Sequence, residues 1–111
     1  MQRILATGVE SLFDFDYGEG WLTIHWICPI RLDSWLQIDP DGFCHREMPI
    51  RSGDGPPQIL EVRSDGFRIR FAPELAEKLE LDTDVEFVCE LSDQTFDDLC
   101  KLKVLFEGGE P

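Results

Sequence analysis

The amino-acid sequence predicts a single α+β domain in which an antiparallel or mixed β-sheet carries two helices on one face. Strand-like patterns fill the first two-thirds of the chain, and two helix-like patterns separated by one further strand pattern fill the rest. The length of 111 residues leaves room for one core, so residues 1–111 are expected to form one domain. A hydrophobic content of 42% with 11% aromatic residues is sufficient for folding without disulfides.

The N-terminal segment predicts two weak extended stretches and then a strong strand. Residues 2–9 have the pattern of a short strand. Residues 10–20 alternate apolar and acidic side chains before two glycines, which predicts an acidic edge strand or loop. Residues 21–28 are rich in aromatic and β-branched side chains, and this favours a strand that ends at Pro29.

A hairpin and a long loop should follow. The tetrapeptide Asp39-Pro-Asp-Gly42 suits a tight turn, because proline presets φ and glycine tolerates positive φ. The strands that it joins are expected at 35–39 and 43–48. Residues 51–57 are rich in glycine and proline, so they are expected to form an exposed loop within the domain.

A second hairpin, a helix, a strand and a final helix complete the predicted order. Residues 58–63 and 67–71 alternate on either side of an Asp-Gly turn, which is a strong hairpin signal. Residues 73–80 begin with a proline at a favoured first helical position. Residues 85–91 alternate as a strand does. Residues 93–106 follow a serine N-cap and carry an acid near the start and lysines near the end, which matches the helix dipole.

The charge balance is the most informative bulk property. Twenty-three acids against ten bases leave a net charge of −13, which repels nucleic acids and anionic membranes and favours a basic protein partner. The alternative is that the charge only maintains solubility. No signal peptide and no apolar stretch of the ~18 residues that a membrane span needs are recognisable, so the expected location is cytoplasmic.

Residues with catalytic or metal-binding potential do not form a known motif. His25 lies in the middle of a predicted strand, and His45 points to the opposite face of its strand from Cys44. Residues 14–19 carry alternating acids but fail the spacing of a calcium loop. We therefore expect no cofactor, no metal and no enzymatic activity. The cysteines lack a C-x-x-C spacing and are expected to be free thiols in a reducing compartment: Cys28, Cys44, Cys89 and Cys100.

The strongest functional signal is a cluster of acids on the predicted helices. Between Glu74 and Asp98 there are ten acids, and Lys78 is the only base. An ordinary solvated helix face is one interpretation. The other is a docking surface for a basic protein, with contacts from Glu74, Glu77, Glu80, Asp97 and Asp98.

The segment from about residue 58 to 106 resembles a family of bacterial polymorphic-toxin immunity proteins, immunity protein ten. The resemblance is carried by a framework of strand, helix, strand and helix: Phe67-Arg-Ile-Arg-Phe71, Pro73-Glu-Leu-Ala-Glu-Lys-Leu79, Val85-Glu-Phe-Val88, and Phe96-Asp-Asp-Leu99 running to Leu105-Phe106. It implies a non-enzymatic protein that neutralises a cognate toxin by tight binding, and it identifies no site residues.

The sequence therefore predicts an immunity-type inhibitor of a basic protein toxin. Two rivals remain: an accessory or structural subunit of a protein assembly, and an enzyme that uses Cys28, Cys44 and the two histidines. The oligomeric state is open. The sequence also leaves open whether Trp21, Trp26 and Trp35 belong to the core or to an interface.

Overall fold

The computed structural model describes residues 1–107, which form eight strands and two helices. Gly108-Gly109, which the sequence predicts as the end of the last helix, lie outside the described residues. In chain order the elements are β1 (Gln2–Asp14), β2 (Glu19–Ile27), β3 (Asp33–Ile38), β4 (Cys44–Glu47), β5 (Arg51–Gly53), β6 (Gln58–Arg63), β7 (Gly66–Arg70), α1 (Pro73–Leu79), β8 (Asp84–Val88) and α2 (Asp93–Phe106).

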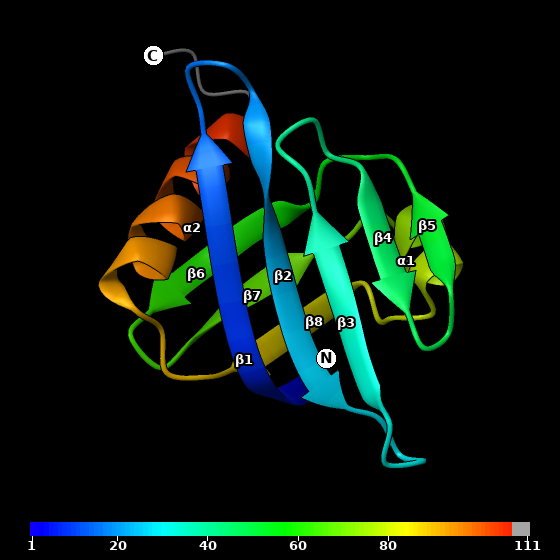
Figure 1. Cartoon of the computed structure of the whole chain (residues 1–111). Coiled ribbons are helices and arrows are strands. Elements are labelled where there is room, and N and C mark those ends of the chain that lie inside the picture. The colour runs from blue at the N-terminus through cyan, green and yellow to red at the C-terminus, as the bar shows by residue number, and fades with distance from the viewer. Residues whose placement is uncertain (108–111) are drawn as a thin grey trace.

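The strands form one mixed sheet in the order β5-β4-β3-β2-β1-β8-β7-β6 (Figure 1). β1 and β8 run parallel, and the other neighbouring pairs are antiparallel. The predicted α+β class with a mixed sheet and two helices is therefore confirmed. Both hairpins are also confirmed, since β3 pairs with β4 and β6 pairs with β7.

β1 belongs to both halves of the sheet. Its residues 2–5 pair with β8, and from Ala6 onward it pairs with β2. The register shifts between Ala6 and Gly8, and such a bulge bends a strand and increases its twist. The two halves consequently cross as two layers (Figure 1).

The prediction of an acidic edge strand or loop at residues 10–20 is confirmed, except that residues 10–14 continue the same strand as residues 2–9. Residues 10–14 lie beyond the pairing of β1 with β8 and pair with β2 alone, residues 15–18 form a turn, and β2 begins at Glu19. The inward side chains Ser11 and Phe13 alternate with exposed Glu10 and Asp14, so the acids occupy the outer face of this edge segment.

The core lies between the two layers, and both helices contribute to it. α1 packs against β5, while α2 packs against β6 and β1. The helices thus lie on the inner side at the two edge strands, where they limit pairing with other chains. Fully buried large side chains include Phe67, Phe71, Phe87, Leu22, Ile24, Leu36, Ile38, Ile59, Ile69, Leu79, Leu99 and Leu102.

The local signals for the helices agree with their observed bounds. The Ser92 hydroxyl accepts a hydrogen bond from the Thr95 N–H at 3.2 Å, so it caps α2. α1 starts at Pro73 and ends at Glu80, which is in the left-handed conformation with φ 56°. A left-handed residue at this place satisfies the last carbonyls of a helix.

The expected loop at 51–57 is partly wrong, because residues 51–53 form β5 on β4. A Cβ atom at Gly53 would lie 2.9 Å from Leu75 Cδ1 and 3.1 Å from Lys78 Cδ. The absence of a side chain therefore allows α1 to approach β5 closely.

Arg46 of β4 attaches α1 to the sheet. Its side chain is 8% exposed, and its Nη1 donates to the carbonyl oxygens of Leu79 at 2.8 Å and Glu80 at 2.9 Å. The guanidinium Cζ lies 5.3 Å from the centroid of Trp26. Trp26 is itself 5% exposed, so this tryptophan belongs to the core, whereas Trp21 and Trp35 are only partly buried.

Candidate functional site

The structure does not bring the five predicted partner-binding carboxylates together. Glu74, Glu77 and Glu80 are exposed on α1, and Asp97 is exposed on α2. The two helices lie on opposite sides of the molecule in Figure 1. A single acidic helical face that joins them is therefore not formed.

Asp98 is a structural residue, and its assignment as a surface contact is wrong. It is 2% exposed, because it faces β1 from the inner side of α2. Its carboxylate accepts hydrogen bonds from the Ser11 hydroxyl at 2.6 Å and the Gln94 amide at 3.1 Å. These bonds satisfy a buried polar side chain, and the bond from Ser11 joins α2 to β1.

The acids of α1 are partly compensated by nearby bases. Glu80 forms an ion pair with Arg51 at 2.9 Å. Glu74 and Glu77 line a groove of about 680 Å³ together with Arg51, Ser52 and Lys78. The α1 surface therefore carries mixed charge and is a weaker attractant for a basic partner than the sequence suggests.

The outer face of β6, β7 and β8 is close to neutral. Arg68 donates two hydrogen bonds of 3.0 Å to Asp84, and this contact holds the pKa of the Asp84 carboxyl below its usual value. The surrounding ion pairs join four arginines to four acids: Arg3, Arg63, Arg68, Arg70, Glu61, Asp65, Asp84 and Glu86. The excess negative charge of the chain must therefore lie elsewhere.

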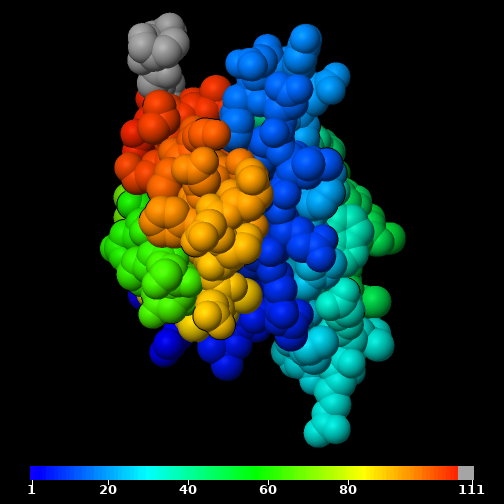
Figure 2. Space-filling view, turned by 60° about the vertical axis from the view of Figure 1, so that its left-hand side comes forward, coloured from blue at the N-terminus to red at the C-terminus, as the bar shows by residue number. Residues whose placement is uncertain are grey.

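A groove lies at the tip of the β1–β2 hairpin, beside α2, and we call it the hairpin groove. Its volume is about 710 Å³. Figure 2 shows the hairpin next to the C-terminal half of α2 on one face of the molecule. The hairpin groove combines apolar and charged side chains: Leu12, Phe13, Asp14, Phe15, Asp16, Glu19, Gly20, Trp21 and Lys101.

Aromatic rings form the apolar part of the hairpin groove. Phe13 and Phe15 stack with their centroids 5.0 Å apart and an angle of 21° between the planes. Lys101 of α2 holds its Nζ 5.8 Å from the centroid of Phe15, in the arrangement of a cation–π contact. Leu12 is 64% exposed, so apolar surface is available at the rim.

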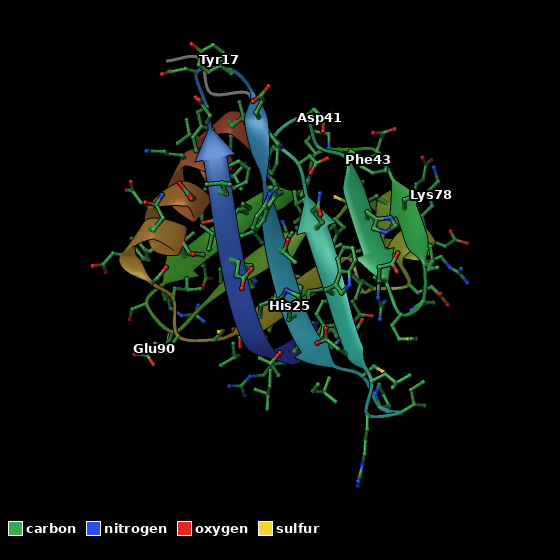
Figure 3. The ribbon with its side chains drawn as sticks, in the orientation of Figure 1. Tyr17, His25, Asp41, Phe43, Lys78 and Glu90 are labelled. Atoms are coloured by element: carbon green, nitrogen blue, oxygen red, sulfur yellow. The ribbon has the colours of Figure 1, made fainter. Side chains whose placement is uncertain are left out.

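The carboxylates of the hairpin groove are uncompensated. Asp14, Asp16 and Glu19 are exposed, and within residues 1–107 none of them lies within 4.0 Å of a basic nitrogen. Asp39 and Asp41 in the β3–β4 turn add further charge. Figure 3 places Tyr17 of the hairpin and Asp41 at the same end of the molecule. These carboxylates give this end of the molecule a negative charge.

Sequence reasoning assigned these acids to a solvated strand and missed the hairpin groove. The available signal was the alternation of phenylalanine and aspartate at residues 13–16, followed by Trp21 after two glycines. The groove also needs Lys101, which is 80 or more positions away in the chain, and only the packing of α2 on β1 brings it there.

Comparisons of the chain with models of protein families, with curated proteins and with solved structures gave no match. No helix among the described residues is both long and apolar enough to cross a membrane.

The histidines and cysteines remain separate from the hairpin groove. His45 contacts Glu47 at 2.6 Å and packs on Trp35 with centroids 5.3 Å apart. Burial raises the pKa of the Cys44 thiol to about 12, so this thiol is protonated and a poor nucleophile at neutral pH. Among residues 1–107, no group of three His, Cys, Asp or Glu side chains is placed to hold a metal ion.

The opposite end of the molecule exposes aliphatic side chains. They lie at the end of β2, in the β2–β3 loop that projects at the bottom of Figure 1, and in the β4–β5 turn. We call this surface the aliphatic end. It consists of Ile27, Ile30, Leu32, Met48 and Ile50, which are between 39% and 70% exposed.

Proposed function

We propose that this chain is a non-enzymatic binding protein that inhibits a basic protein, in the manner of an immunity protein acting on a toxin. The observation that carries the proposal is the hairpin groove, in which partly buried aromatic side chains and exposed Leu12 adjoin three carboxylates that have no ion-pair partner within residues 1–107. The resemblance of residues 58–106 to the immunity protein ten family supports the class of function. The net charge of −13 supports a basic partner.

The two components of the hairpin groove have different roles in binding. Uncompensated carboxylates steer a basic partner toward the site and raise the association rate. Aromatic side chains supply the buried contacts that dominate affinity at the centre of an interface. Trp21 and the Phe13–Phe15 pair would be the anchors that the sequence left unidentified.

The proposal predicts that charge reversal at the hairpin groove weakens binding more than charge reversal on α1. The hairpin variant carries Asp14→Lys, Asp16→Lys and Glu19→Lys. The control variant carries Glu74→Lys, Glu77→Lys and Glu80→Lys, and both change the net charge equally. We expect affinity for the captured basic protein to fall about 100-fold or more in the hairpin variant and less than about 10-fold in the control.

The experiment starts with capture of a basic protein from lysate of source cells, followed by titration calorimetry and an assay of the captured protein's own activity. Wild-type protein should inhibit that activity and the hairpin variant should not. Equal losses of affinity in both variants would mean that binding depends only on the net charge of the chain and not on the hairpin groove. A larger loss of affinity in the α1 variant would show that the partner binds at α1 and not at the hairpin groove.

The aliphatic end favours a second candidate function, an accessory or structural subunit. Contiguous exposed apolar surface commonly marks a protein interface. If this surface mediates assembly, light scattering should show a mass that rises with concentration, and Ile50→Asp should restore the monomer mass. Val104→Asp is the matched control, because Val104 is exposed on α2 and gains the same charge. A concentration-independent monomer mass for the wild-type protein would eliminate self-assembly.

A further inference from the structure

We infer that the hairpin groove recognises an arginine side chain of the partner, and that Lys101 occupies the place of this cation in the free protein. The inference rests on the proposed function and names the chemistry recognised at the same site. It is carried by the position of Lys101, which lies over an aromatic ring in a groove that is also lined by three carboxylates.

Lys101 shows that the hairpin groove accepts a cation. Its Nζ lies over the Phe15 ring and 3.5 Å from Asp97 Oδ2, one helical turn away. Its side chain is 57% exposed, so solvent reaches it and no buried contact holds it in place. An ion pair of this exposure contributes little to stability, and the lysine can therefore swing away at low cost.

One lysine does not neutralise the hairpin groove. Asp14, Asp16 and Glu19 remain uncompensated after Asp97 is paired with Lys101. The groove volume of about 710 Å³ is sufficient for a long side chain that takes the place of Lys101. A cation that displaces Lys101 would therefore gain both the aromatic contact and the unused carboxylate oxygens.

Arginine fits this surface better than lysine does. A guanidinium is planar, stacks on aromatic faces, is weakly hydrated and donates two parallel hydrogen bonds to one carboxylate. An ammonium group is a compact, strongly hydrated charge, so it loses more solvation on an aromatic surface. Phe15 offers the guanidinium plane the ring face that Lys101 covers, and Phe13 and Trp21 line the same groove.

The test uses acetylated penta-arginine, with penta-lysine and penta-glutamate as comparison peptides. Binding to the full chain is followed by NMR through the three indole N–H signals, assigned with single Trp→Phe variants. Penta-arginine should shift the Trp21 signal, should leave the signal of buried Trp26 in place, and should bind at least about 3-fold more tightly than penta-lysine. Penta-glutamate should not bind.

Two lysine variants test the role of Lys101. Lys101→Met removes the internal cation and should tighten penta-arginine binding about 3- to 10-fold. Lys103→Met is the control, because it removes the same charge from the same helix and Lys103 pairs with Glu107 at 3.0 Å. It should change the affinity for penta-arginine by less than about 2-fold. Equal tightening by both variants, or a peptide response at Trp35 instead of Trp21, would overturn the inference.

The outcomes separate this inference from the proposed function. If penta-arginine fails to bind the hairpin groove while the basic protein still depends on Asp14, Asp16 and Glu19, the arginine inference is wrong and the inhibitor proposal stands. If penta-arginine binds as expected and no captured basic protein is inhibited, the hairpin groove recognises arginine but the inhibitor proposal fails.

Discussion

Phe87→Ala is expected to lower the free energy of unfolding by about 3–5 kcal/mol, the largest effect of any substitution considered. Phe87 lies on β8 with no exposed surface. Its ring stacks on Phe67 with centroids 5.3 Å apart, and Trp26 from the other layer lies 6.0 Å away. The truncation therefore opens a cavity where the two layers meet. Urea denaturation followed by circular dichroism measures the loss.

Leu12→Ala is the control for Phe87→Ala. Leu12 also lies on a strand but is 64% exposed, so its truncation should change the free energy of unfolding by less than about 0.5 kcal/mol. A cost below about 1 kcal/mol for Phe87→Ala would contradict the close packing of the two layers at this point.

Arg46→Ala is expected to lower the free energy of unfolding by about 3 kcal/mol. The reason is that two carbonyl groups at the end of α1 lose their donor and the Trp26 ring loses its contact with the guanidinium. Arg46→Met should lower the free energy of unfolding by a smaller amount. Methionine refills the space without a buried charge, whereas in the wild type burial lowers the pKa of Arg46 and its Nε has no hydrogen-bond partner among residues 1–107. Urea denaturation of both variants measures the difference.

Hydrogen exchange locates the effect of Arg46→Ala. The amide protons of Glu80 and Leu81, which bond to carbonyl oxygens of α1, should exchange faster in Arg46→Ala. The amides of α2, on the other side of the molecule, should change only with global stability. Unchanged exchange at the end of α1 would show that Arg46 does not hold this helix.

Local sequence signals predicted the hairpins and helices because each depends on residues that are neighbours in the chain. Gly42 adopts φ 93° after Asp39-Pro-Asp, and the Asp-Gly turn precedes β7. The extended conformation of residues 2–14 was also predicted, but as two separate stretches and not as one strand that joins the two layers. Their place depends on pairing with β2 and on the bend near Gly8, and both are tertiary features.

The sequence predicted that the chain has an acidic surface, but it did not predict which carboxylates are available on that surface. Glu80 and Asp98 appear equivalent to other helical acids in the sequence. Packing gives Glu80 an arginine partner from β5 and buries Asp98 against Ser11 of β1. Both contacts join residues far apart in the chain, so helical periodicity alone could not show that these carboxylates are unavailable.

The sequence by itself determined the α+β class, the turns, the helix ends and the excess of acid, since composition and short-range patterns specify all of these. The tertiary structure decided which charges are compensated. It placed arginines beside the acids on the outer face of β6–β8, brought bases next to α1, and left the carboxylates of the hairpin groove next to partly buried aromatic rings. The physical reason is that an ion pair forms only between side chains that the fold brings within about 4 Å of each other, whatever their separation in the sequence.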